Sequence, residues 1–245
     1  MVIAIDIGNT NLHLGRFRDR RLIRVLVISS RGRIHWARIR SFLSSGAVSR
    51  VVLASVQPRL DRPLKALVRS TLGLTPLVVD HRHPSGLKLG YERPWTLGAD
   101  RIAGAAGALA LFRRHAIVVS FGTAITVDAV MKNGYFPGGF ILPGPDLMAA
   151  ALHEHAARLP KVRFRSASRG IGRSTANAIR SGTMLGAAGA VRELVRSIRS
   201  QYDRSFIVLA TGGRARLIAP LVPEVDFTVP HLGLYGLFSH SQRYA

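Results

Sequence analysis

The chain has 245 residues, no cysteine and a formal net charge of +22. Its length allows one large domain or two lobes around a sizeable core, and its 47% hydrophobic content excludes a disordered chain. The lack of cysteine excludes disulfides, cysteine-bound zinc, iron–sulfur clusters and thiol catalysis.

The positive charge is nearly all arginine, and it is spread over the whole length of the chain. Groups such as Arg16–Arg24, Arg31–Arg40, Arg163–Arg173 and Arg192–Arg199 show this distribution. Aromatic residues, 7% of the chain, do not interleave with these groups as stacking platforms would, so we expect an arginine-rich surface and no binding of nucleic acid. Asp6 interrupts the apolar start, and no apolar run reaches the roughly 18 residues of a membrane span. We therefore expect a cytoplasmic protein without a targeting signal.

The first half of the chain predicts a sheet followed by helices. Apolar runs at Val2–Ile5 and Leu12–Phe17 flank the turn residues Asp6–Asn11, which is typical of a β-hairpin. Further elements are expected in chain order: strand Leu22–Ile28, helix His35–Leu43, strand Val51–Ser55, helix Leu64–Leu72, strand Leu77–Val79, loop Asp80–Trp95 and helix Gly98–Arg114. The last helix is crowded with Ala and Gly, so it can pack very close to another backbone.

The second half repeats the opening with an offset of 114 residues. Ala116–Thr123 matches Val2–Asn9 as an apolar strand, a short polar residue, an apolar residue, Gly and a small polar residue. A strand at Ile125–Val130 follows, and a late strand at Ile207–Ala210 runs into Thr211, Gly212 and Gly213. Ser174 is a plausible N-cap of a second long helix. We predict an α/β fold of two lobes, residues 1–113 and 114–245, each with a mixed sheet flanked by helices.

Strand–glycine–strand turns have a specific chemical use. Glycine lets the backbone approach a ligand, and successive N–H groups converge on an anion. Two such turns at equivalent positions can grip a polyphosphate from both sides, and Thr10 and Thr123 add hydroxyl donors. Together with the late Gly-Gly turn they form the pattern of the actin, Hsp70 and sugar-kinase superfamily, which implies a duplicated ribonuclease H-like fold.

Five local motifs occur in a fixed order. They are Ile5-Asp6-Ile7-Gly8-Asn9-Thr10-Asn11, Leu97-Gly98-Ala99-Asp100-Arg101, Phe121-Gly122-Thr123-Ala124-Ile125-Thr126, Gly138-Gly139-Phe140-Ile141-Leu142-Pro143-Gly144 and Ser174-Thr175-Ala176-Asn177-Ala178-Ile179-Arg180-Ser181-Gly182. Together they resemble the type III pantothenate kinase family, from residue 2 to about residue 237.

The resemblance implies an activity and a set of residues. The family transfers the γ-phosphate of ATP to the 4′-hydroxyl of pantothenate, the first step of coenzyme A synthesis, as a homodimer with Mg²⁺ beside the nucleotide. The implied ATP-binding residues are Asp6, Ile7, Gly8, Asn9, Thr10, Asn11, Leu12, His13, Gly122, Thr123, Gly212 and Gly213, with Asp6 near Mg²⁺. The implied pantothenate-binding residues are Tyr91, Gly98, Ala99, Asp100, Arg101 and Thr175, with Asp100 as catalytic base.

The residue types fit that chemistry independently. An alcohol nucleophile needs one carboxylate to receive its proton. Asp100 lies at a helix start, where the helix dipole favours an anion, so we expect it to be ionised. Arg101 either pairs with the pantothenate carboxylate or forms a surface ion pair with Asp100. Asp128 either faces the phosphates or makes a hydrogen bond at a strand end, and Asp146, after Pro145, is expected to cap a helix.

Ser120 departs from the family pattern. The family has Asp at this position, where it binds a monovalent cation, usually K⁺ or NH₄⁺, and Ser120 is also the counterpart of Asp6 in the internal repeat. A hydroxyl carries no charge, so we expect this cation site to be weak or absent. Two alternatives to an active pantothenate kinase stay open: a non-catalytic transcription-accessory protein on the same fold, and a kinase of the superfamily for another small alcohol.

Overall fold

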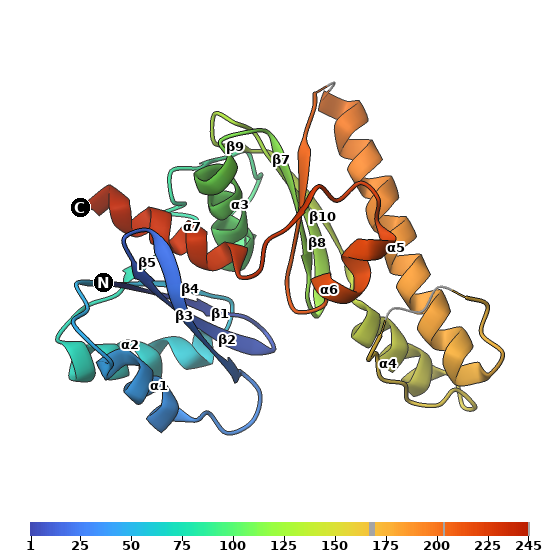
Figure 1. Cartoon of the computed structure of the whole chain (residues 1–245), viewed down its shortest axis with the longest axis horizontal. Helices are drawn as coiled ribbons and strands as arrows, with labels where there is room; N and C mark the ends of the chain where they lie inside the picture. Colours follow the sequence, from blue (N-terminus) through green and yellow to red (C-terminus); the bar gives the residue numbers. More distant parts are fainter. Residues whose placement is uncertain (167–169, 203, 245) are drawn as a thin grey trace. The chain divides into compact units, whose positions relative to one another are not determined.

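The protein is described by a computed structural model that covers residues 1–166, 170–202 and 204–244 (Figure 1). The chain forms two compact units. Unit 1 contains Met1–Arg113, Val130–Gly138 and His231–Ala245, and unit 2 contains Arg114–Ala129 and Gly139–Pro230. Each unit is described by itself below.

Unit 1 is built on a five-stranded sheet with the order β3-β2-β1-β4-β5. The strands are β1 Val2–Ile7, β2 Asn11–Arg18, β3 Arg21–Ser29, β4 Arg50–Ser55 and β5 Leu77–Val78. Strand β1 pairs antiparallel with β2 and parallel with β4, which confirms the predicted hairpin. Since β1 is buried on both faces, its apolar run is nearly continuous and Asp6 is the one charge in it.

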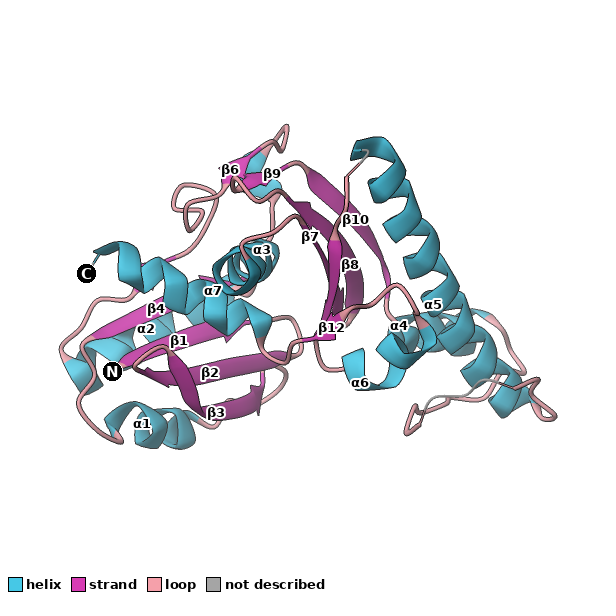
Figure 2. Cartoon of the chain, turned by 45° about the horizontal axis from the view of Figure 1, so that its top comes forward, coloured by secondary structure: helices cyan, strands magenta, loops and turns pink. Residues whose placement is uncertain are grey.

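The helices of unit 1 cover both faces of its sheet (Figures 1 and 2). They are α1 Trp36–Ser44, α2 Pro58–Leu72, η1 Pro94–Thr96, α3 Ala99–Phe112, α7 Leu232–Ser241 and η3 Gln242–Tyr244. Helices α1 and α2 enclose a core with β1 and β2 that includes Ile5, Ile39 and Leu64. A small parallel sheet joins β6 Lys88–Leu89 to β9 Tyr135–Phe136.

Glycines bring α3 and α7 into very close contact. A Cβ on Gly107 would lie 2.3 Å from the carbonyl oxygen of Leu232, and one on Gly236 would lie 2.0 Å from that of Ala103. The close approach predicted for the small-residue helix is therefore confirmed. The same contact explains why the end of the chain packs in unit 1, so that unit 2 ends at Pro230 rather than continuing to residue 245 as the sequence-based division had it.

Unit 2 repeats the strand arrangement of unit 1. Its sheet has the order β10-β8-β7-β11-β12, in which β7 takes the place of β1 and is likewise parallel to the next strand, β11. The strands are β7 Ala116–Phe121, β8 Ala124–Val130, β10 Gly138–Pro143, β11 Ile207–Thr211 and β12 Phe227–Thr228. This equivalence confirms the predicted duplication (Figure 2).

The helices of unit 2 are α4 Pro145–His155, α5 Thr175–Tyr202, α6 Ala215–Ile218 and η2 Ala219–Leu221. Ser174 precedes α5, and its Oγ accepts a hydrogen bond of 3.3 Å from the N–H of Asn177, the cap that its side chain predicts. Val191, Val195 and Ile198 form the buried stripe of this helix. Among the described residues, no helix combines the length and the hydropathy that crossing a bilayer requires.

Candidate active site

The turn between β1 and β2 is held by hydrogen bonds from three sides. The N–H of Gly8 donates to the carbonyl of Asn11 at 2.9 Å, and Ser30 donates to the carbonyl of Thr10 at 2.8 Å. The Gln57 amide donates to Oδ1 of Asn9 at 2.9 Å. A Cβ on Gly8 would lie 3.1 Å from the Asn11 carbonyl, so this tight turn favours glycine. The backbone at the predicted phosphate turn is therefore fixed in place before any ligand binds.

Asp6 is a half-buried residue that lies next to the last residue of β1, just before this turn. It lies opposite His13 in the pairing of β1 with β2. Its Oδ1 is buried and has no hydrogen-bond partner among the described residues. Burial, and secondly the like charge of Asp100, raise the pKa of Asp6 to about 7. Asp6 is thus poised to receive a cation.

The residues here fit Mg²⁺ as it binds beside a nucleotide. Mg²⁺ is commonly held by one or two carboxylates, with phosphate oxygens and waters completing its shell. Asp6 and Asp100 are close enough for the charge of one to shift the pKa of the other. The described residues contain no cluster of three or more His, Cys, Asp or Glu that could hold a metal by itself. A cation at Asp6 would therefore depend on oxygens from the phosphates.

Asp100 is the second residue of α3, as predicted, yet burial dominates its titration. Its Oδ1 accepts a hydrogen bond of 2.8 Å from the N–H of Arg101. Crowding by protein raises the pKa of Asp100, and the hydrogen bond and charge of Arg101 offset this only in part. The pKa of Asp100 is therefore shifted upward in spite of the favourable helix start, and its ionised state stays a prediction. Its side chain still reaches solvent, so an incoming hydroxyl can approach it.

Arg101 is buried, which excludes the surface ion pair as its setting. Its exposed fraction is 7%, and its Nη1 donates to the Tyr91 hydroxyl at 3.2 Å. The guanidinium also lies over the rings of Tyr91 and Phe136, at 5.6 and 5.9 Å from their centroids. The structure thus brings together Tyr91 and Arg101, two of the residues predicted to bind the acceptor.

Helix α7 adds two residues that sequence reasoning missed. His231 precedes α7 with φ of 57°, and its ring centroid lies 5.4 Å from that of His13. Burial, and then the charge of His231, lower the pKa of His13 to about 4, so His13 is neutral at pH 7. A Cβ on Gly233 would lie 3.4 Å from Oδ2 of Asp6. No local motif marks these residues, because the packing of α7 in unit 1 brings His231 to His13 and Gly233 to Asp6.

The two glycine turns of unit 2 share a contact with the end of β7. After β7, the N–H of Gly122 donates to the Ala124 carbonyl at 3.1 Å, and Gly144 donates to the Thr123 carbonyl at 2.9 Å. After β11, Gly212 has φ of +91°, and a Cβ there would lie 2.6 Å from the Phe121 carbonyl oxygen. The turn at Gly122–Thr123 and the turn at Gly212–Gly213 are therefore neighbours.

Ser120 occupies in unit 2 the position that Asp6 occupies in unit 1. It is the last but one residue of β7 and pairs with Thr211 of β11, as Asp6 is the last but one residue of β1 and pairs with Ala54 of β4. Asp128 is buried in β8, where a Cβ on Gly139 would lie 2.7 Å from its Oδ1. Thr175 is the exposed first residue of α5.

The predicted site residues divide between the units. Unit 1 holds the Asp6–His13 turn, Tyr91 and the Gly98–Arg101 segment, whereas unit 2 holds Gly122, Thr123, Gly212, Gly213 and Thr175.

The duplicated fold is the predicted actin-like fold, which solved structures of other proteins share. Component A of (R)-2-hydroxyglutaryl-CoA dehydratase from Acidaminococcus fermentans shares it, with a TM-score of 0.59, 15% identity and coverage of 100% of this chain and 99% of that one. The ROK hexokinase from Thermus thermophilus shares it with a TM-score of 0.56, 16% identity and the same coverage. These two likenesses show the fold of the chain.

Sequence comparison identifies the family of the chain. The family model for type III pantothenate kinase matches residues 2–197. A type III pantothenate kinase from Thermomicrobium roseum is 38% identical over 99% of this chain and 97% of its own length. One from Desulfosudis oleivorans is 36% identical, with 97% of each chain covered. The chain belongs to the type III pantothenate kinase family.

Proposed function

We propose that this chain phosphorylates pantothenate at its 4′-hydroxyl with ATP, the first committed chemistry of coenzyme A synthesis. Family membership supports the reaction, and the observation that carries it in the structure is the pair of carboxylates in unit 1, Asp6 and Asp100, which lie close enough for the charge of Asp100 to raise the pKa of Asp6. Asp6 and Asp100 both have raised pKa values, so a cation or a proton bound beside them would be stabilising.

The glycine turns are the proposed ATP site. Residues Asp6–His13 would contact the phosphates in unit 1, and Gly122, Thr123, Gly212 and Gly213 would contact the nucleotide in unit 2. Asp6 would hold Mg²⁺, which neutralises charge on the transferring phosphoryl group when bound. Because His13 is neutral at pH 7, it offers the phosphates a hydrogen bond rather than a full positive charge.

Asp100 is the proposed catalytic base. The 4′-oxygen of pantothenate bonds to the γ-phosphorus while the bond to the bridging oxygen of ADP breaks, and the hydroxyl proton passes to the Asp100 carboxylate. A raised pKa makes the ionised carboxylate a stronger proton acceptor. The hydrogen bond from the Arg101 N–H to Oδ1 holds the carboxylate in one orientation.

Tyr91, Gly98, Ala99, Arg101 and Thr175 are the proposed contacts for pantothenate. The guanidinium of Arg101 lies over the rings of Tyr91 and Phe136 and donates to the Tyr91 hydroxyl, so it has little freedom left to lose when it binds a carboxylate. Pantothenate carries one carboxylate, which such a group can bind through two hydrogen bonds.

We also propose that two copies of the chain associate through unit 2. Its described part exposes Ile141 of β10, Leu147 and Leu152 of α4 and Leu185 of α5, and Ile141 is 62% exposed. On α5, Gly182, Gly186 and Gly189 have open space where a Cβ would be. Apolar side chains beside a glycine-lined helix face suit close packing against a second copy.

Catalysis is proposed to need no monovalent cation. The carboxylate that a K⁺ ion would require at the end of β7 is replaced by the uncharged Ser120. Direct measurement of the ADP formed in stopped reactions, with pantothenate as acceptor, tests the reaction and this point together. We expect turnover that depends on pantothenate and changes less than twofold when Na⁺ replaces K⁺. No turnover with pantothenate, but turnover with another small alcohol, would assign a different kinase; binding of nucleic acid without any turnover would favour an accessory protein.

A further inference from the structure

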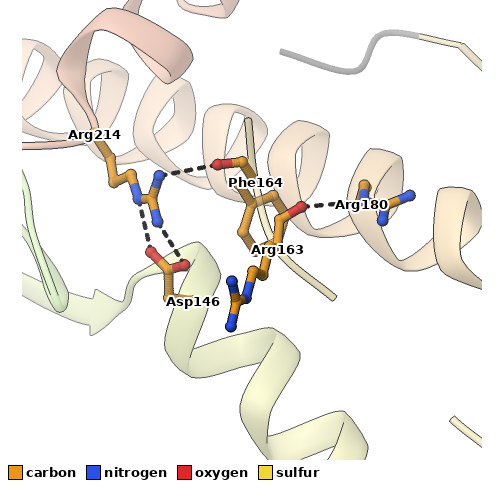
Figure 3. Close-up of polar contacts among 5 residues, drawn as sticks. All are labelled: Asp146, Arg163, Phe164, Arg180 and Arg214. Carbon is orange, nitrogen blue, oxygen red and sulfur yellow. Dashed lines mark hydrogen bonds and ion pairs between the residues drawn. The ribbon is translucent and has the colours of Figure 1, made fainter. Parts of the chain in front are cut away.

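Arg214 makes three hydrogen bonds that tie together distant parts of unit 2 (Figure 3). Its Nε and Nη2 donate to Oδ2 and Oδ1 of Asp146, each at 2.8 Å. Its Nη1 donates to the carbonyl oxygen of Phe164 at 3.1 Å. The two parallel bonds to one carboxylate fix both the distance and the plane of the guanidinium. We call Asp146, Phe164 and Arg214 the arginine clamp.

The clamp connects the two glycine turns of unit 2. Arg214 directly follows the turn at Gly212–Gly213, and its own N–H donates to the Phe121 carbonyl at 2.9 Å. Asp146 lies in the first turn of α4, whose N-cap Gly144 donates to the Thr123 carbonyl at 2.9 Å. A closed path therefore runs from the turn after β7 through the start of α4 and Arg214 to the turn after β11.

The third partner of the clamp is the extended segment 162–165. Val162 and Phe164 of this segment are buried. Its other anchor is Arg180, whose Nε donates to the Arg163 carbonyl at 3.1 Å. Figure 3 shows the two arginines holding the segment at successive carbonyls. The segment thus supplies a fixed acceptor for Arg214.

Stability alone does not account for the clamp. The side chains of Arg214 and Asp146 are 33% and 50% exposed, and ion pairs in such settings contribute little to folding. Asp146 does not cap α4 as its position predicted, because Gly144 is the N-cap and makes no side-chain cap bond. What the bidentate geometry does fix is the position of the residue next to Gly213.

We infer that Arg214 is a positioning residue for the nucleotide: with Asp146 and Phe164 it holds the Gly212–Gly213 turn at a set distance from the Gly122–Thr123 turn. This rests on the proposed function, in which both turns contact ATP. Glycines leave the turn conformationally free, so an anchor at the adjoining residue reduces the entropy lost when nucleotide binds. Lysine cannot replace Arg214, because one ammonium cannot form the paired bonds.

The test compares Arg214→Ala, Arg214→Lys and Asp146→Asn with the matched control Arg192→Ala. Arg192 also pairs with a carboxylate in unit 2, that of Glu224, but lies away from both turns in the chain. We expect Kd for a fluorescent ATP analogue, and KM for ATP, to rise roughly tenfold in the first three variants, which equals about 1.4 kcal/mol. KM for pantothenate and the melting temperature should change little, and Arg192→Ala should match the wild type.

Combining Arg214→Ala with Asp146→Asn should add little to either change, since both remove one interaction. Unchanged Kd for the analogue, equal rises in KM for both substrates, or fully additive effects would overturn the inference. Thr123→Ala separates it from the proposed function. If Thr123→Ala weakens nucleotide binding and the clamp variants do not, only the clamp is wrong. If the wild type binds no nucleotide, both the clamp and the proposed site are wrong.

Discussion

The two units share one strand order but differ in how their carboxylates are paired. Unit 1 buries Asp6 and crowds Asp100, and it shifts the pKa values of His13 and His231 as well. None of these four residues has an ion-pair partner within hydrogen-bond distance in the described part of the chain. In unit 2, by contrast, Asp146 and Glu224 are paired with arginines.

This difference distinguishes carboxylates that are free to take part in a reaction from carboxylates that hold the structure in place. Desolvated carboxylates without an ion-pair partner are costly, and they occur where a cation or a proton is to be received. Paired carboxylates in exposed settings fix geometry at little cost. Unit 1 has Asp6 near the end of β1, whereas unit 2 has Ser120 at the equivalent position of β7 and an arginine, Arg214, beside its glycine turns.

Asp100→Asn is the strongest way to break this comparison. Removing the proton acceptor should lower kcat by roughly 10²–10⁴-fold, the usual contribution of a general base. The substitution keeps the size of the side chain, so Kd for ATP should stay within about twofold. Steady-state kinetics and nucleotide titration measure both quantities. A kcat within a few-fold of wild type would show that Asp100 is not the base.

Asp6→Asn should abolish turnover and yet stabilise the protein above pH 7. The pKa of Asp6 is about 7 in the folded chain and near 3.8 when unfolded, so the folded state holds a proton that the unfolded state has lost between these values. Stability of the wild type should therefore fall as pH rises through this window, by an amount on the order of 4 kcal/mol.

Urea unfolding at pH 5 and pH 8, without divalent cations, measures this effect. The asparagine variant should lose much less stability between the two values than the wild type. Glu193→Gln, which changes an exposed carboxylate of α5, serves as control and should follow the wild type. Equal pH dependence in wild type and Asp6→Asn would contradict the burial of an unpaired charge.

Local signals in the sequence predicted the elements that local chemistry determines. The hairpin around Gly8, the cap at Ser174 and the close-packing face of α3 all follow from residues that are neighbours in sequence. The internal repeat predicted the shared strand order, because equivalent apolar runs must occupy equivalent places in their sheets.

Long-range packing set what the sequence could not predict. The pKa of Asp100 depends on atoms that crowd it from elsewhere in the chain, and these outweigh the helix start that the sequence revealed. His231 lies against His13, and Gly233 lies beside Asp6, because α7 packs into unit 1 from the other end of the chain. Arg214 and Asp146 are 68 residues apart, and neither belongs to a motif. In the sequence, nothing distinguishes Arg214 from the many other arginines of the chain.

Ser120→Asp should make unit 2 resemble unit 1. A new carboxylate at the end of β7 would be partly desolvated, so we expect a loss of about 1–3 kcal/mol at pH 8 in the absence of K⁺. The loss should diminish at pH 5, where the carboxyl can take up a proton, and on addition of K⁺. Ser120→Asn adds similar bulk without charge and should show neither response. Insensitivity of Ser120→Asp to K⁺ would show that the end of β7 does not form a monovalent cation site.

Gly186→Leu is expected to change the fold least, and it tests whether α5 of unit 2 forms the surface between two copies. Leucine in place of glycine favours an exposed helix by about 1 kcal/mol, so α5 should form at least as well. Its side chain would occupy the open space along α5 that we propose for a second copy. Light scattering should give the mass of a dimer for wild type and of a monomer for Gly186→Leu. Ala37→Leu, on an exposed position of α1 in unit 1, should remain dimeric. A wild-type chain that is monomeric at micromolar concentration would overturn the proposed association, and a Gly186→Leu variant that stays dimeric would place it elsewhere than on this face of α5.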